Sequence, residues 1–162
     1  MIKITNVSKV YKNGEVETHA LKNINLTIND GELVVILGPS GSGKSTLLNV
    51  ISGLDKVSSG SILFQDIELT KLSDDGMTKF RREHLGFIFQ QFNLLQNLTV
   101  YENIQIGAEI SEQPLSIDEL LPKIGLEQLR NKYLYQLSGG EQQRVSIERS
   151  VLATSTWSKN RD

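Results

Sequence analysis

Apolar and polar residues alternate along the first 28 residues, a pattern typical of β-strands that are covered on one face. The alternating apolar positions include Ile2, Ile4, Ile24, Leu26 and Ile28. Residues 29–31, Asn-Asp-Gly, predict a turn. Residues 33–37 are continuously apolar and rich in β-branched side chains, which predicts a strand covered on both faces in a parallel sheet.

The rest of the sequence alternates between glycine breaks, short strands and helices. Short strands are predicted at 61–69 and 86–89. Helices are predicted at 46–51, 73–83 and 141–152, and residues 99–133 show helical pieces broken by Pro114, Pro122 and Gly125. Residues 154–162 show no periodicity and predict an irregular tail.

The amino-acid composition excludes several classes of protein. The 162 residues are 38% hydrophobic and 22% charged, which fits a globular chain of one domain. The absence of cysteine excludes disulfides, thiolate metal sites and cysteine nucleophiles. A net charge of −2 argues against a nucleic-acid partner. No apolar run is long enough for a signal peptide or a membrane span, so we expect a cytoplasmic chain without direct membrane insertion.

A glycine-rich loop lies between the predicted strand at 33–37 and the helix at 46–51. Its sequence, Gly38-Pro39-Ser40-Gly41-Ser42-Gly43-Lys44-Ser45, followed by Thr46, matches the P-loop pattern. Glycines let several backbone N–H groups point at a phosphate, and the following helix adds its positive end. Lys44 can reach the β- and γ-phosphates, and the Ser45 hydroxyl can ligate Mg²⁺. The alternative is a flexible Gly/Ser loop.

A second glycine motif follows about 94 residues later, at residues 137–141, Leu-Ser-Gly-Gly-Glu. Ser138 and the amides of Gly139 and Gly140 could form a second phosphate site at the start of a helix. Ser138 and Glu141 could instead form a capping box, and both interpretations can hold together. This motif resembles the signature of ATP-binding-cassette (ABC) proteins.

The resemblance covers residues 1 to about 152 and is closest to the ATP-binding subunits of lipoprotein-release, macrolide-export and antimicrobial-peptide-resistance transporters, the LolD/MacB-like group. Further matching phrases are Gly-Leu-Asp at 53–55, Arg-Arg at 81–82, Gly-Phe-Ile-Phe-Gln-Gln-Phe-Asn-Leu-Leu at 86–95 and Leu-Thr-Val-Tyr-Glu-Asn-Ile at 98–104. The resemblance implies an α/β P-loop fold of ABC type with an N-terminal antiparallel β part. It also implies a partial ABC domain at 1–153, with a helical segment at 98–135.

Site roles follow from the same resemblance. Tyr11 corresponds to the aromatic residue that stacks on adenine, unless it only packs at a strand edge. Gln90 corresponds to the glutamine that touches Mg²⁺ and relays to the membrane subunit, unless it is a solvated loop amide. Lys44 and Gln90 are therefore the candidate catalytic residues, with ATP and Mg²⁺ as cofactors. Two subunits would pair head to tail, so that residues 138–141 of one subunit close on the γ-phosphate held by the other.

The residues that usually complete hydrolysis in this family are missing. No apolar strand ending in Asp-Glu and no histidine follow the signature, and Asp118-Glu119 is a poor substitute because it falls in the helical segment. We therefore expect a chain truncated before Walker B, without the C-terminal part of the core sheet. Such a chain would leave an apolar strand edge unpaired and hydrolyse ATP poorly by itself.

The leading hypothesis is an ATP-binding subunit, or its N-terminal fragment, of an ABC transporter. It would couple ATP binding and hydrolysis to export or extraction through a membrane permease, at the inner face of the plasma membrane. One alternative is a non-catalytic ATP-binding or interaction fragment that pairs with an intact subunit. Another is a soluble ABC ATPase that does not transport.

Overall fold

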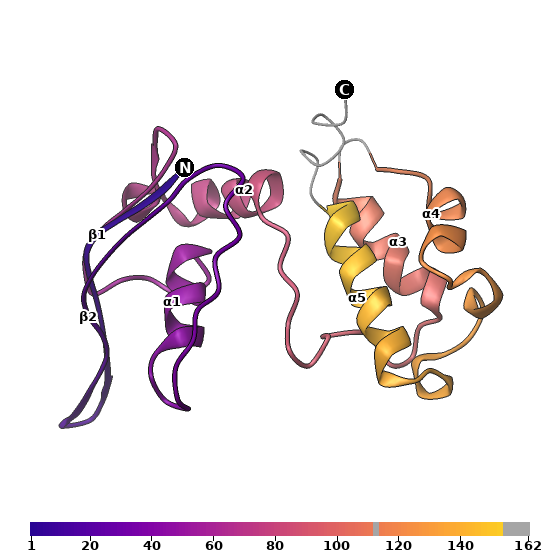
Figure 1. The fold of residues 1–162 in the computed structure, drawn as a ribbon, viewed down its shortest axis with the longest axis horizontal. Helices are drawn as coiled ribbons and strands as arrows, with labels where there is room; N and C mark the ends of the chain where they lie inside the picture. The colour runs from indigo at the N-terminus through magenta and orange to yellow at the C-terminus, as the bar shows by residue number, and fades with distance from the viewer. Residues whose placement is uncertain (112–113, 154–162) are drawn as a thin grey trace. The chain divides into compact units, whose positions relative to one another are not determined.

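The computed structural model describes residues 1–111 and 114–153. The chain divides into two compact units, an N-terminal unit, Met1–Thr78, and a C-terminal unit, Lys79–Asp162 (Figure 1). Within the described ranges, no helix has the length and apolar character needed to cross a bilayer. The tail predicted at 154–162 lies outside the described residues.

The N-terminal unit is built on an antiparallel sheet with the strand order β2-β1-β3-β4. The strands are β1 (Ile2–Asn13), β2 (Val16–Ile28), β3 (Ser59–Phe64) and β4 (Ile67–Glu68). A long hairpin pairs β1 with β2, and its register places Ile4 opposite Leu26 and Tyr11 opposite Thr18. The strands predicted from the alternation and the antiparallel β part implied by the resemblance are therefore confirmed. The predicted strand at 61–69 is divided by a turn at residues 65–66.

Helix α1 (Lys44–Ile51) belongs to this unit, and a 3₁₀ turn, η1 (Leu69–Lys71), follows β4. The buried apolar residues of the unit come from the sheet, α1 and η1: Ile4, Val7, Leu21, Val50, Ile62 and Leu69. Ile4 is buried between the exposed Lys3 and Thr5, as strand alternation requires. A register shift between Ile4 and Val7 brings Val7 onto the buried face as well.

The predicted strand at 33–37 is wrong. The structure places these residues outside any strand of the part it describes, and Leu33 and Leu37 are 93% and 85% exposed. The predicted strand at 86–89 is also absent from the described structure. A buried parallel strand needs a neighbour on each side, and the sheet of the N-terminal unit runs from β2 to β4 without taking up residues 33–37. Local apolar character alone therefore does not produce a strand here.

The C-terminal unit is helical, as predicted. Helix α2 (Asp74–His84) begins in the N-terminal unit, and α3 (Val100–Ile110), α4 (Ile117–Lys123) and α5 (Gly139–Ala153) follow. Two 3₁₀ turns, η2 (Glu127–Leu129) and η3 (Leu134–Gln136), connect α4 to α5. Pro122 is the last but one residue of α4, which ends at Lys123, so the helix ends beside the breaks expected at Pro122 and Gly125.

The core of the C-terminal unit lies between α3, α4 and α5. Its buried side chains include Val100, Ile104, Leu121, Leu126, Leu134, Val145 and Leu152. Helices α3 and α5 run side by side (Figure 1). They approach closely at Gly107, where an added Cβ would lie 2.1 Å from the carbonyl oxygen of Arg149. Only glycine fits this crossing without moving the helices apart.

Candidate functional site

The P-loop residues of the N-terminal unit form a turn that leads directly into α1. Gly43 precedes the helix with a left-handed φ of 86°. A Cβ at this position would lie 2.5 Å from the carbonyl oxygen of Ala20, so the loop packs directly on the backbone of β2. Both the backbone conformation and this close approach require glycine.

Lys44, the first residue of α1, folds back over the loop. Its ammonium group donates hydrogen bonds to the carbonyl oxygens of Gly38, at 2.9 Å, and Pro39, at 2.6 Å. It also lies 3.4 Å from the hydroxyl of Ser42. The loop thus holds a positive charge at the start of a helix whose first turn contains no acidic residue. This combination of an ammonium, a helix N-terminus and a glycine loop suits a phosphate.

The remaining loop residues are accessible for ligand contacts. Ser45 is exposed and Thr46 is half-buried, both in the first turn of α1. The other exposed residues of the loop are Gly38, Pro39, Ser40, Gly41 and Ser42. The hydroxyls of Ser45 and Thr46 therefore sit beside the helix N-terminus, where a phosphate and its cation would be held.

Tyr11 lies on β1 and is 41% exposed. Its hydroxyl donates a hydrogen bond of 2.7 Å to Oδ2 of Asp55, and the ammonium of Lys9 lies 4.8 Å from the centre of its ring. Lys9 and Tyr11 share one face of the strand because they are two residues apart. The phenol is therefore anchored at its hydroxyl end by a residue that follows α1.

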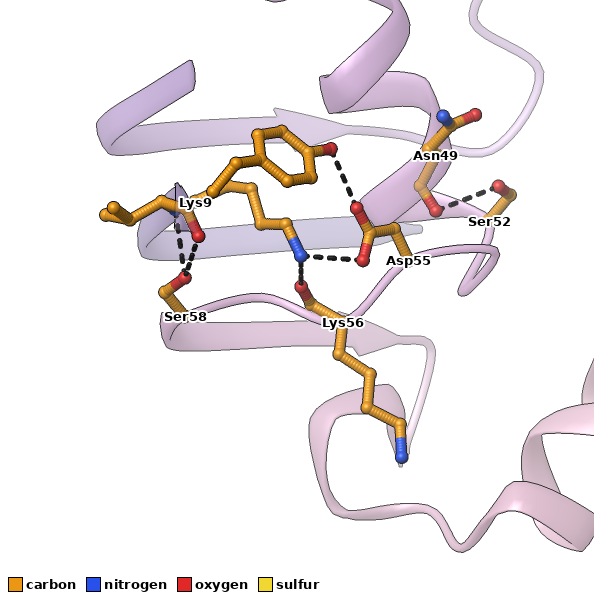
Figure 2. A network of polar contacts seen from close by, with 8 residues as sticks. Lys9, Asn49, Ser52, Asp55, Lys56 and Ser58 are labelled. Atoms are coloured by element: carbon orange, nitrogen blue, oxygen red, sulfur yellow. Dashed lines mark hydrogen bonds and ion pairs between the residues drawn. The ribbon is translucent and has the colours of Figure 1, made fainter. Parts of the chain in front are cut away.

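Asp55 is the centre of a polar network around the end of α1 (Figure 2). Lys9 donates to Oδ1 of Asp55 and to the carbonyl oxygen of Lys56, both at 2.6 Å. The side chain of Lys9 is only 11% exposed and that of Asp55 29% exposed. Burial raises the pKa of Asp55, but the hydrogen bonds from Lys9 and Tyr11, with the charge of Lys9, bring this pKa below its ordinary value. Asp55 therefore stays ionised near neutral pH.

The same network is tied to α1 itself. The carbonyl oxygen of Asn49 accepts hydrogen bonds from the N–H of Leu54 at 2.9 Å and of Asp55 at 3.1 Å, and from the hydroxyl of Ser52 at 3.1 Å. Further along, the N–H of Val10 donates to the hydroxyl of Ser58 at 2.9 Å. Figure 2 shows that the bonds of Lys9 and of Ser58 join the segment after α1 to β1.

The sequence did not identify Lys9 or Asp55 as site residues. The spacing of Lys9 and Tyr11 was an available signal, because it places both on one strand face. The contacts between Asp55 and β1 bridge more than 40 residues of sequence, and a local pattern does not report such contacts.

The second glycine motif begins α5 in the C-terminal unit. Oε2 of Glu141 accepts hydrogen bonds from the N–H of Ser138 at 2.6 Å and from its hydroxyl at 2.7 Å. The N–H of Glu141 in turn donates to the Ser138 hydroxyl at 3.4 Å. The bonds from the hydroxyl and the N–H of Ser138 lower the pKa of Glu141, burial opposes them, and the charge of Arg144 lowers this pKa further. The capping box considered from the sequence is therefore present.

Gly139 and Gly140 are exposed, and their backbone amides form the first turn of α5. An added Cβ at either position would meet nothing within 4 Å. The motif thus presents an open helix N-terminus. Ser138 and Glu141 cap this terminus by bonding to each other.

Gln90 is exposed in a turn of the C-terminal unit. The segment that follows it is anchored to α5, because Arg149 donates to the carbonyl oxygens of Asn93, at 2.8 Å, and Phe92, at 3.1 Å. The hydroxyl of Ser146 also donates to Phe92, at 3.1 Å. The structure therefore holds the segment after Gln90 in place and leaves the glutamine accessible.

The structure places Tyr11, the P-loop and Asp55 in the N-terminal unit, with Tyr11 in contact with Asp55 and the P-loop at the start of α1. Gln90 and residues 138–141 belong to the C-terminal unit. Assembly of all these residues around one nucleotide stays a prediction, as do the domain boundaries at 98–135 and 153.

Comparison with known proteins supports the family resemblance. The family model described as ABC transporter matches residues 21–157. A putative ABC transporter ATP-binding protein of Mycoplasma genitalium, MG065, is 49% identical over 153 residues, which are 93% of this chain and 33% of that protein. The macrolide export ATP-binding/permease protein MacB of Shigella flexneri is 41% identical over 157 residues, which are 94% of this chain and 24% of that protein.

Solved structures show the same fold. The dimeric structure of the ATP-binding cassette MJ0796 in a post-hydrolysis state, bound to ADP and Pi, matches with a TM-score of 0.83 at 44% identity. The match covers 94% of this chain and 70% of that chain. The MJ0796 protein of Methanocaldococcus jannaschii is 46% identical over 160 residues, which are 93% of this chain and 68% of that protein.

The chain spans about a third of the length of the mycoplasma relatives. The family resemblance and the P-loop α/β fold class predicted from the sequence are confirmed. The relatives are named as ATP-binding proteins of ABC transporters, which also agrees with the predicted function. The chain belongs to the ABC transporter family.

Proposed function

We propose that this chain binds ATP with Mg²⁺ at the P-loop of the N-terminal unit. The observation that carries the proposal is the position of Lys44, whose ammonium lies on the loop carbonyls of Gly38 and Pro39 at the N-terminus of α1. When a nucleotide is bound, this ammonium would exchange the carbonyl oxygens for phosphate oxygens. The Ser45 hydroxyl would supply a ligand to Mg²⁺, and the Tyr11 ring would contact adenine.

The proposed role is that of an ATP-binding subunit which drives a membrane permease in export or extraction. The match to MacB, named as a macrolide export ATP-binding/permease protein, supports the coupling to a permease. The match to a dimeric cassette supports head-to-tail pairing, in which residues 138–141 would close on a nucleotide held by a second subunit. Attachment to a permease would keep the chain at the inner face of the plasma membrane.

Isothermal titration of the full chain with ATP, with and without Mg²⁺, tests the proposal. Lys44→Ala should weaken ATP binding by about tenfold to a hundredfold, because it removes a charged partner of the phosphates. Lys22→Ala is the matched control, since Lys22 is an exposed lysine on β2 outside the loop. Equal ATP affinities of the Lys44→Ala variant and the unmodified chain would refute a phosphate site at this loop.

A further inference from the structure

The hydroxyl of Tyr11 is held by the protein although the residue is partly exposed. A tyrosine that is 41% exposed can satisfy its hydroxyl with water, so it needs no protein acceptor. In this chain the hydroxyl nevertheless donates to a carboxylate, Oδ2 of Asp55 at 2.7 Å. A bond to an ionised acceptor is among the stronger hydrogen bonds in proteins, so it restricts the rotation of the ring.

The two faces of the Tyr11 ring have different surroundings, because a cation lies over one of them. The Lys9 ammonium lies 4.8 Å from the ring centre and is itself held by Asp55 and by the carbonyl oxygen of Lys56. One face of the phenol is therefore covered by a cation that cannot easily leave. A flat ligand would have to stack on the opposite face, and the anchored hydroxyl determines where that face points.

Helix α1 connects the anchor of the Tyr11 ring to the candidate phosphate site. Asp55 and Leu54 donate their N–H groups to the carbonyl oxygen of Asn49 in the last turns of α1. The first residues of the same helix are Lys44 and Ser45. A short rigid helix therefore lies between the P-loop at one end and the anchor of Tyr11 at the other.

We infer that Asp55 is a positioning residue for nucleotide binding, which fixes the Tyr11 ring relative to the P-loop so that base and phosphates are recognised at a set separation. This inference rests on the proposed function, because it assumes that the P-loop holds the phosphates. Asp55 contacts neither the base nor the phosphates in this role. It acts through Tyr11 on one side and through α1 on the other.

The role predicts a specific pattern of ligand affinities. Tyr11→Phe keeps the ring but removes the bond to Asp55, and Asp55→Ala removes the anchor itself. Each should weaken binding of ATP by about threefold to tenfold, the range expected for one hydrogen bond. Binding of inorganic triphosphate, which has no base, should not change. The double variant should lose little more ATP affinity than either single variant, because both changes break the same contact.

The experiment is isothermal titration of the full chain and its variants with Mg-ATP and with inorganic triphosphate, joined to proton NMR of the bound nucleotide. Stacking on Tyr11 should shift the adenine H2 and H8 signals upfield, and this shift should shrink in both variants. A purely structural role of Asp55 would not change the ring-current shift selectively. Asp55→Asn, which keeps an oxygen acceptor for Lys9, should restore part of the ATP affinity.

Glu17→Gln is the matched control. It breaks an exposed ion pair with Lys12, at 2.7 Å, on the same hairpin and should leave both affinities unchanged. Thermal melts followed by circular dichroism show whether each variant folds. If Asp55→Ala fails to fold because it leaves Lys9 without its carboxylate, Tyr11→Phe carries the test, since the phenyl ring retains the packing.

The outcomes separate this inference from the proposed function. Loss of affinity for ATP alone supports the positioning role. Equal losses for ATP and triphosphate would overturn it, since Asp55 would then support only the P-loop, and unchanged ATP affinity would overturn it as well. If the unmodified chain binds neither ligand, the proposed function fails and this inference fails with it.

Discussion

The carboxylate of Glu141 accepts two hydrogen bonds from Ser138, one from its N–H at 2.6 Å and one from its hydroxyl at 2.7 Å. The Ser138 hydroxyl is also one of the groups that the sequence assigns to a phosphate at the start of α5, together with the amides of Gly139 and Gly140. A γ-phosphate held by a second subunit would have to replace the carboxylate as acceptor, and the negative charge of Glu141 would oppose its approach. The cap and the proposed phosphate contact thus compete for the Ser138 hydroxyl.

Glu141→Gln should therefore strengthen ATP-dependent pairing of two chains. Glutamine can complete the same capping box without a charge, so the helix start is retained while the repulsion is removed. We expect the dissociation constant of the dimer in ATP to fall about fivefold, which corresponds to removing one repulsion between two charges in a mostly aqueous environment. Analytical ultracentrifugation with ATP measures it, and Glu119→Gln, an exposed acid on α4, is the control. Weaker pairing of the Glu141→Gln variant would contradict the competition.

The capping box at the start of α3 should make stability depend on acidity. Glu102 accepts hydrogen bonds from the N–H of Thr99 at 2.8 Å and from its hydroxyl at 2.7 Å. These bonds lower the pKa of Glu102 from its ordinary value of 4.5, while burial opposes them slightly. A lowered folded-state pKa stabilises the fold above pH 4.5, and this contribution disappears as the pH falls through the lowered value.

Glu102→Gln keeps the acceptor oxygen but does not titrate in this range. Between neutral pH and pH 3, the variant should lose less stability than the unmodified chain, because this carboxylate no longer contributes to acid unfolding. Urea unfolding across that range, followed by circular dichroism, measures the difference. Parallel acid profiles of the two chains would show that the Thr99 bonds do not depend on the charge.

The crossing of α3 and α5 depends on the absence of a side chain at Gly107. Gly107→Ala would place Cβ 2.1 Å from the carbonyl oxygen of Arg149, so the helices must separate. We expect a loss of about 1 to 3 kcal/mol in the free energy of unfolding, which is typical of overpacking. Gly140→Ala is the matched control, because a Cβ there would meet nothing within 4 Å. Urea unfolding compares the two variants. Similar stabilities would show that the crossing of α3 and α5 tolerates a Cβ at position 107.

Asn103 holds the segment before α3 through both ends of its side-chain amide. Its Oδ1 accepts from the N–H of Leu95 at 2.8 Å, and its Nδ2 donates to the carbonyl oxygens of Leu95, at 3.1 Å, and Thr99, at 3.0 Å. The side chain is fully buried. Asn103→Leu would leave these backbone groups unsatisfied, and we expect a loss of about 2 to 4 kcal/mol. Amide hydrogen exchange should accelerate at Leu95. Asn97→Ala, at an exposed position, should change neither quantity.

The elements that were predicted correctly from the sequence are those whose determinants lie within a few residues of one another. Helices α2 and α5 begin and end within about two residues of the predicted bounds, because their periodicity and caps lie within the helices themselves. The P-loop was also identified correctly as a turn before a helix, because its glycines are required by the backbone conformation. The alternation around Ile4 also predicted the buried face of β1, because the periodicity of a strand is a local property of the sequence.

Structure that depends on distant residues was not predicted. Residues 33–37 have the composition of a buried strand, but a parallel ladder requires partners that local sequence does not specify. The contact between Asp55 and Tyr11 joins β1 to the segment after α1, and no periodicity marks it. The turn that carries the candidate phosphate site was therefore predicted, and the contacts that anchor the tyrosine were not.

Residues 33–37 also have a thermodynamic consequence. They enter the P-loop from its N-terminal side with Leu33, Val35 and Leu37 largely exposed to solvent. Any event that covers these side chains, whether nucleotide binding or pairing with another chain, would remove apolar surface from water and lower the heat capacity of the system. Calorimetric titrations at several temperatures would therefore report the covering of this segment through the slope of the enthalpy, separately from the affinity of the phosphate site itself.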